Sequence, residues 1–150
     1  MYQWQFEKYK ASAEEVGRIF EEIEKRDGAI TPEAVVEEAR SEDSPLHDDF
    51  EWNDTEAARK YRIDQARKMI SLVIRVADDK TPIRAYVNVE RGVNKGRYMN
   101  IEKVVEEDDL WSVVLANARR ELQIFTSKHR RYQKFAELCG AIDKFLEETA

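Results

Sequence analysis

The chain has 150 residues, of which 42% are hydrophobic and 37% are charged, and its formal net charge is −6. This length suits one domain, residues 1–150, with a single core. No apolar run approaches the about 18 residues of a membrane-spanning helix, the first thirty residues are too charged for a secretory signal, and the one cysteine excludes an internal disulfide and favours a reducing cytoplasm.

The first two helices are predicted from their start signals. Residues 13–26 follow Ser12 as N-cap and end before Gly28, which can adopt the left-handed conformation that closes a helix. Residues 32–40 follow Thr31 as N-cap and have Pro32 at the first helical position. One buried face of the first helix is formed by Val16, Ile19, Phe20 and Ile23.

A third helix is predicted over residues 55–70, capped by Asn53 or Asp54. Large apolar residues stand in the polar loop before it, so we expect Leu46, Phe50 and Trp52 to reach the core. The candidate buried positions of the third helix are Ala58, Tyr61, Ile63, Ala66, Met69 and Ile70.

Beyond residue 70 the hydrophobic period changes from that of a helix to that of a strand. β-Branched and aromatic residues are concentrated in 71–77, 82–90 and 97–102, with turn-forming segments between them. These segments predict a small antiparallel β-meander or hairpin of two or three strands over residues 71–101. Residues 82–90 alternate as in a half-buried strand. The predicted buried face consists of Ile83, Ala85, Val87 and Val89, and the predicted polar face consists of Arg84, Tyr86, Asn88 and Glu90.

The remaining residues, 102–150, are predicted to be helical. A long helix over 110–129, capped by Asp108 or Asp109, is followed by a last helix over 132–148, and the two are expected to pair as an antiparallel hairpin. The last helix carries one apolar stripe at 3-4-3 spacing, formed by Phe135, Leu138, Ile142 and Phe145. The predicted fold class is therefore α+β and predominantly helical, with three N-terminal helices in residues 1–70.

Sequence motifs of catalysis and cofactor binding are absent. There is no GxxxxGK[ST], GxGxxG, HExxH or CxxC. His47 stands among acidic residues that could hold a hard cation, but their spacing matches no metal loop and acids before a helix are ordinary capping groups. Cys139 lies on the apolar side of the last helix, as a buried thiol would. We therefore expect a protein that is not an enzyme and has no cofactor or metal.

Charge is unevenly distributed along the chain. Residues 1–58 hold 6 Lys/Arg and 17 Asp/Glu, residues 59–134 hold 18 and 10, and the net charges of the two parts are −11 and +8. Such asymmetry indicates a polyanion or a charged protein as partner. The alternative is that the acidic part folds against the basic part and neutralises it.

Three helices followed by a β-hairpin is the order of a winged helix-turn-helix, in which the third helix enters the DNA major groove and the hairpin contacts the backbone. This order predicts DNA binding by phosphate neutralisation, although the acidic second helix would lie near the phosphates and repel them. The candidate contacts are Arg59, Lys60, Arg62 and Lys68 in the third helix, Arg91, Lys95 and Arg97 in the hairpin, and Arg130 and Arg131 between the last two helices.

The alternative function is a protein–protein interaction module, such as an adaptor, assembly factor or inhibitor, that acts by charge complementarity without nucleic acid. Exposed aromatic residues would be its anchors. Residues 2–6 alternate as YQWQF, which indicates either an edge strand or an exposed arm that pairs with a second copy. A homodimer built through this arm or through the final helices is a further expectation, and no membrane partner is expected.

Several strings of the sequence are distinctive, among them SPLHDDFEW, YVNVE, RYMNIEKVV and ARRELQIFTSKHRRYQKF. In these strings and the residues around them, which cover most of the chain, the sequence resembles a family of small proteins encoded by bacteriophages and prophages, without an established activity. The resemblance implies a phage-derived accessory protein in the cytoplasm of a bacterial host, where it acts on DNA, on virion assembly or on a host protein. It carries no catalytic residues over to this chain.

Overall fold

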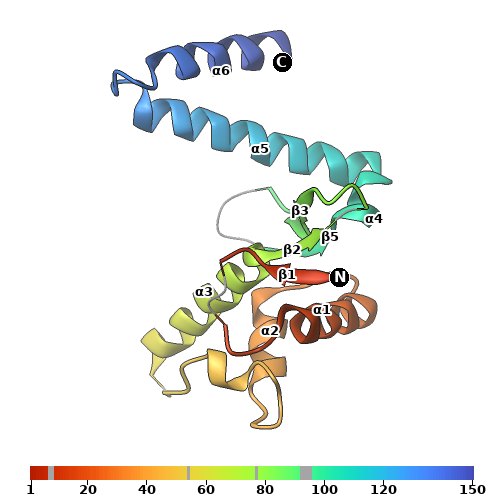
Figure 1. Ribbon diagram of the computed structural model, residues 1–150. Coiled ribbons are helices and arrows are strands. Elements are labelled where there is room, and N and C mark those ends of the chain that lie inside the picture. The colour runs from red at the N-terminus through yellow and green to blue at the C-terminus, as the bar shows by residue number, and fades with distance from the viewer. Residues whose placement is uncertain (7–8, 54, 77, 92–95) are drawn as a thin grey trace.

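The computed structural model describes residues 1–6, 9–53, 55–76, 78–91 and 96–150, and its fold is α+β (Figure 1). The elements in chain order are β1 (Tyr2–Trp4), α1 (Ala13–Asp27), α2 (Pro32–Ala39), the 3-10 helix η1 (His47–Asp49), α3 (Glu56–Leu72), β2 (Val73–Val76), β3 (Pro82–Arg84), β4 (Tyr86–Asn88), β5 (Tyr98–Asn100), α4 (Ile101–Val105), α5 (Asp108–His129) and α6 (Ala136–Glu148). In Figure 1, α1, α2 and α3 form the lower part of the molecule, the small sheets lie in the middle, and α5 and α6 lie on top.

The predicted start signals of α1 and α2 are confirmed. Ser12 forms a reciprocal capping box with Glu15, and the Thr31 side chain accepts from the backbone N–H of Ala34. Gly28 ends α1 with φ 80°, a conformation that a residue with a Cβ rarely adopts. Local chemistry therefore sets the bounds of these two helices.

The predicted caps of the third and fifth helices are wrong. α3 is capped by Thr55, whose side chain accepts from the backbone N–H of Ala58, and not by Asn53; Asp54 lies outside the described residues. α5 already begins at Asp108 and has no side-chain cap. The carboxylates of Asp108 and Asp109 stand in its first turn, where the helix dipole favours negative charge.

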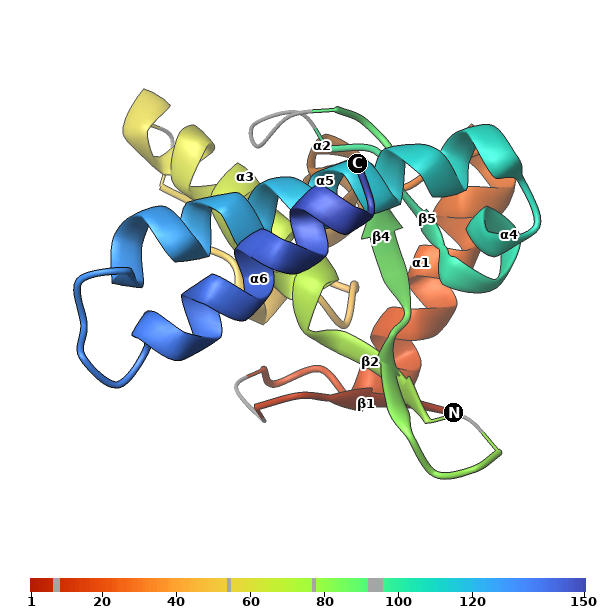
Figure 2. The same ribbon diagram turned by 90° about the horizontal axis from the view of Figure 1, so that it is seen from above.

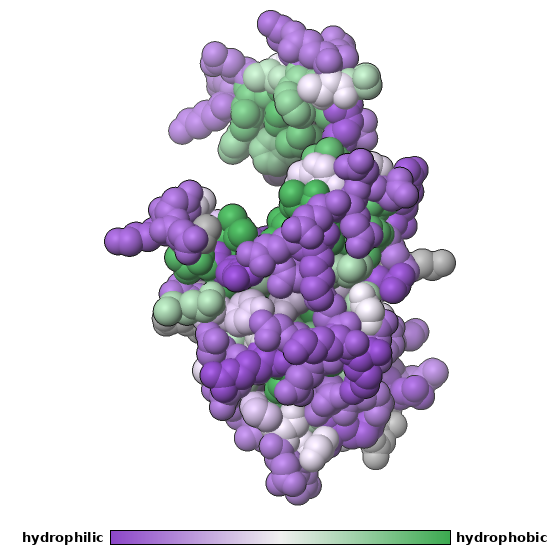
Figure 3. All heavy atoms as spheres, turned by 90° about the vertical axis from the view of Figure 1, so that its right-hand side faces the viewer, coloured by the Kyte–Doolittle hydropathy of each residue, from purple (hydrophilic) through white to green (hydrophobic). Residues whose placement is uncertain are grey.

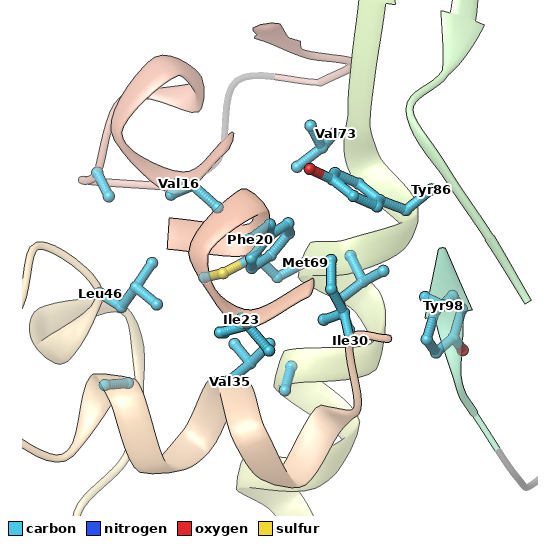
Figure 4. Packing of buried hydrophobic residues seen from close by; sticks show 14 of the residues in the cluster. Val16, Phe20, Ile23, Ile30, Val35, Leu46, Met69, Val73, Tyr86 and Tyr98 are labelled. Atoms are coloured by element: carbon cyan, nitrogen blue, oxygen red, sulfur yellow. The ribbon is translucent and has the colours of Figure 1, made fainter. Parts of the chain in front are cut away.

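The main core lies between α1, α2, α3 and the strands that follow them (Figure 4). Leu46 and Phe50 are buried in it and Trp52 packs against it, as expected of this loop. In α3 the expectation fails at one position, because Tyr61 is 56% exposed and its neighbour Arg62 is buried instead. The fully buried members of the core include Val16, Phe20, Ile23, Ile30, Val35, Leu46, Met69, Ile70, Val73 and Tyr86.

The strand predicted over 82–90 is divided between two antiparallel sheets. β3 pairs with β2 in a sheet of order β1-β2-β3, whereas β4 pairs with β5, and Ala85 lies between β3 and β4. Tyr86, which the alternation assigned to the polar face, is fully buried with its ring centre 5.5 Å from that of Phe20. The strand is therefore covered on both faces at this point.

Residues 2–4 form an edge strand rather than a free arm. β1 pairs with β2 in antiparallel register, with Gln3 opposite Ile74. The backbone N–H of Tyr2 donates to Glu14 at 3.0 Å. The N-terminal arm is thus held within its own chain.

A second, smaller core fixes α5 on the β4–β5 sheet. Val87, Val89 and Val104 are buried there, and Trp111 and Val114 of α5 pack against them. Past this contact α5 continues with α6 packed along it, as the view from above shows (Figure 2). Within the described ranges, none of the helices is both long and apolar enough to cross a bilayer.

Candidate nucleic-acid interface

The N-terminal half of α3, predicted to read DNA, lies beside acidic residues of α2. The two helices enclose a groove of about 470 Å³ whose charged lining residues are Arg40, Arg59, Lys60 and Arg62 together with Glu33, Glu37 and Glu56. Carboxylates on both walls oppose the approach of a phosphate. This groove is of mixed charge and is not an open positive surface.

Arg62, the third predicted contact in α3, has a structural position. Its side chain is 2% exposed, and Nη1 donates to the carbonyl oxygens of Glu51 at 2.9 Å and Asn53 at 3.0 Å. The guanidinium carbon lies 5.2 Å from the centre of the Trp52 ring. The guanidinium of Arg62 is therefore buried and hydrogen-bonded to the loop before α3. For this reason we remove Arg62 from the candidate DNA contacts.

The string SPLHDDFEW builds this loop. The Trp52 indole N–H donates to the carbonyl of His47 at 2.8 Å, and the two rings stack with their centres 4.9 Å apart. The Asp49 carboxylate accepts from the backbone N–H groups of Lys10 and Ala11. This loop therefore joins the segment around Lys10 and Ala11 to the residues before α3. Within the described part of the chain, no group of three or more His, Cys, Asp or Glu residues is placed so that it could hold a metal ion.

The remaining predicted cations differ in their surroundings. Lys68 lines a groove with Asp48, Asp49 and Asp64. Arg130 forms a two-pronged ion pair with Asp143, with distances of 2.8 and 3.0 Å. Three further predicted contacts have exposed side chains: Arg91 and Arg97, beside β4 and β5, and Arg131, in the α5–α6 turn. Lys95 lies outside the described residues.

A different pair of arginines faces a cleft between β4 and α5, which we call the α5 cleft. Arg84, from β3, and Arg120, from α5, line this cleft, which has a volume of about 340 Å³. Within the part of the chain that the structure describes, no ion pair engages either guanidinium. Glu121 contributes an acid to the same walls, which also include Asn88, Tyr98 and Asn117.

Asn117 fixes one wall of the α5 cleft. Its Nδ2 donates to the carbonyl of Glu90 at 3.0 Å and to that of Asn88 at 3.5 Å, so α5 is attached to the backbone of the β4 segment. Its Oδ1 is buried and has no hydrogen-bond partner in the described structure. Arg120, three residues further along α5, lines the same cleft.

The Tyr98 phenol lies on the wall of this cleft. Burial raises the pKa of its phenol, while the charges of Arg67 and Arg84 act in the opposite direction because they stabilise the phenolate. Guanidinium groups are planar and carry several N–H donors, which match the oxygens of a phosphate. The α5 cleft therefore has the chemistry of an anion-binding site.

The ion pairs between described residues lie mostly within one part of the chain. Among the ion pairs between described residues, Lys103–Glu24 joins the basic part to the acidic N-terminal part. The pairs of Arg26, Arg40, Arg67 and Arg75 stay within their own part of the chain. Ion pairs between described residues therefore join the basic and acidic parts at Lys103, while Arg59, Lys60 and Lys68 share grooves with acids of the N-terminal part.

Arg84 and Arg120 were not among the predicted contacts. Arg84 could have been found as the outward residue of the alternating strand, and Arg120 belongs to an Arg–Arg pair in the long helix. Their convergence on one cleft depends on how α5 crosses the strands, which the local pattern does not specify. No family model, no curated protein and no solved structure matches this chain.

Proposed function

We propose that this protein is a non-enzymatic nucleic-acid-binding protein that holds phosphates of duplex DNA in the α5 cleft. The observation that carries the proposal is the convergence of Arg84 and Arg120 on one cleft, with no ion pair of either among the described residues. Cations that are not held in an ion pair can replace the counterions condensed on DNA, and the release of those ions drives binding.

Arg91 and Arg97, which are exposed beside β4 and β5, are the further cations that we assign to the DNA backbone. In this arrangement the strands and α5 contact the DNA backbone, as the wing does in the predicted module, while the N-terminal half of α3 takes no part. An accessory role of this kind agrees with the predicted phage or prophage origin and with the predicted cytoplasm of a bacterial host.

Fluorescence anisotropy with a random-sequence duplex, measured over a range of salt concentrations, tests the proposal. We expect the logarithm of the binding constant to fall linearly with the logarithm of the salt concentration, with a slope of about −0.9 per phosphate contacted. Arg84→Gln together with Arg120→Gln should weaken binding and make the slope shallower by about two. Glu121→Gln, which removes the acid of the same cleft, should strengthen binding by about threefold.

The matched control reverses charge in the groove between α2 and α3. Arg59→Glu with Lys60→Glu should leave the affinity within about twofold of the unaltered protein, whereas Arg84→Glu with Arg120→Glu should lower it by at least about tenfold. The reverse result assigns binding to α3 and overturns the cleft proposal. Absence of binding at low ionic strength overturns nucleic-acid binding altogether.

The second candidate is a protein–protein interaction module that acts by charge complementarity with a host or phage protein. It is favoured by four exposed carboxylates on and after α2, those of Glu33, Glu37, Glu42 and Asp43, of which Glu37 pairs with Arg40. A basic partner would bind there without touching the α5 cleft. Charge reversal at Glu37 and Glu42 should then abolish the interaction and leave DNA binding unaffected.

A further inference from the structure

The apolar stripe of α6 is only partly covered by its own chain. Leu138 is 47% exposed and Phe145 is 51% exposed, although both were predicted to pack on the preceding helix. α6 contacts α5 with a neighbouring face instead, on which Cys139 is fully buried and the Leu146 carbonyl accepts from Arg119 at 2.8 Å. Figure 3 shows apolar side chains gathered at this end of the molecule.

The apolar residues of α6 have the spacing of a helix–helix seam. Leu138, Ile142 and Phe145 follow each other at intervals of four and three residues along one line of the helix, with Leu138 and Phe145 exposed and Ile142 half-buried. Phe135, the N-cap residue of α6, packs against Phe125 of α5 with the ring centres 6.1 Å apart. A contiguous apolar line of this kind on a protein surface indicates an interface. Its width and period fit one further α-helix.

Opposite charges stand at the two ends of this seam. Lys134 precedes it in the exposed α5–α6 turn, which also carries Arg131, and Glu147 and Glu148 follow it at the end of α6. Arg131 and Lys134 form no ion pair with the described residues, and Glu148 has only a contact of 3.9 Å with Lys144 at the surface. The turn before the seam is thus basic and the last residues of α6 are acidic, while Glu137 and Lys144 lie between these two ends.

We propose that α6 is the dimerisation helix of this protein and that it pairs with α6 of a second copy in antiparallel orientation. A two-fold axis near Ala141 and Ile142 sets Leu138 of each copy against Phe145 of the other, as a symmetric interface requires. The same axis brings Lys134 of each copy to Glu148 of the other. A parallel pair would instead oppose like charges at both ends.

Sedimentation equilibrium or light scattering after gel filtration tests the proposal. The unaltered protein should be a dimer, and Leu138→Glu with Phe145→Glu should give a monomer with unchanged helix content by circular dichroism. The matched control, Tyr61→Glu, places the same charge at an exposed aromatic residue of α3 and should leave the dimer intact. A protein that stays monomeric up to about 100 µM, or a dimer that survives both changes in α6, overturns the proposal.

Charge exchange tests the antiparallel orientation. Lys134→Glu and Glu148→Lys should each weaken the dimer by about tenfold, because each creates two like-charge contacts in a symmetric dimer. The protein with both changes should recover the original dissociation constant, since the opposite charges again face each other. A double variant that is no tighter than either single variant contradicts the antiparallel pairing.

Discussion

Arg62 is a cation whose charge is used inside the protein. It lies in the predicted DNA-reading helix, yet its hydrogen bonds satisfy two backbone carbonyls of the loop and its guanidinium faces the Trp52 ring. A buried acceptor left without its donor costs its full desolvation penalty, so such a residue stabilises the fold more than a surface arginine does. The burial of each basic side chain therefore has to be known before that side chain is assigned to a ligand.

We expect Arg62→Met to lower the free energy of unfolding by about 2–4 kcal/mol, because it keeps much of the side-chain volume and removes both hydrogen bonds. Urea denaturation followed by circular dichroism measures the change. Arg59→Met, at an exposed position three residues earlier, should alter stability by less than about 0.5 kcal/mol. Equal effects of the two substitutions contradict the structural role of Arg62.

The raised pKa of the Tyr2 phenol predicts that the protein loses stability at alkaline pH. Its hydroxyl donates to Glu21 at 2.6 Å, and burial, followed by this contact with a carboxylate, raises the pKa of the phenol to about 12. The unfolded chain has a tyrosine pKa of about 10. The folded state therefore binds the proton more tightly, and the resulting stabilisation is complete below pH 10 and is lost as the pH rises from about 10 to about 12.

Urea midpoints measured at several pH values in this range check the prediction. The unaltered protein should lose about 1–2 kcal/mol from this group, and Tyr2→Phe should show a smaller decrease. Some decrease remains in the variant because burial also raises the pKa of Tyr86. An identical decrease in both proteins contradicts the assignment to Tyr2.

Between elements, the attachment of α5 to the β4 segment depends on one amide. Asn117 donates to the carbonyls of Asn88 and Glu90, and Trp111 and Val114 add apolar contacts one to two turns earlier. Asn117→Ala should lower the free energy of unfolding by about 1–3 kcal/mol and speed hydrogen exchange at the backbone N–H of Val89, which donates to Arg97. Gln123→Ala, at an exposed position of the same helix, should change neither quantity.

The elements also show what local sequence determines. α1 and α2 were predicted to within one residue because Ser12, Thr31 and Gly28 act through bonds to their own neighbours. The burial of Tyr86, the division of its strand between two sheets and the exposure of Leu138 and Phe145 depend on contacts between distant elements. Periodicity identified the apolar stripe of α6 correctly but could not tell whether its own chain or another covers it.

The candidate site was predicted in part for the same reason. The concentration of cations in residues 59–134 is a property of the sequence, but only the fold separates Arg62, which is buried, and Arg59, which faces acids, from Arg84 and Arg120 in the α5 cleft. Burial withdraws Arg62 from the predicted reading helix, whereas Arg59 and Lys60 stay exposed in a groove of mixed charge, and the proposed site lies instead where α5 crosses the strands. The position of the site is thus a tertiary property.

The two proposals together predict avidity for the complete molecule. An α6-paired dimer carries two α5 clefts, so a duplex long enough to reach both makes the second contact within one complex, at a high effective concentration. Breaking the dimer with Leu138→Glu and Phe145→Glu should therefore weaken binding to a duplex of about 40 base pairs by about tenfold to a hundredfold. It should leave binding to a duplex of about 10 base pairs, which offers one cleft its phosphates, within about twofold. Anisotropy titrations with the two lengths at one salt concentration measure this difference. Equal losses on both duplexes indicate that the α6 substitutions affect the cleft itself, and no loss on either indicates that the clefts act independently.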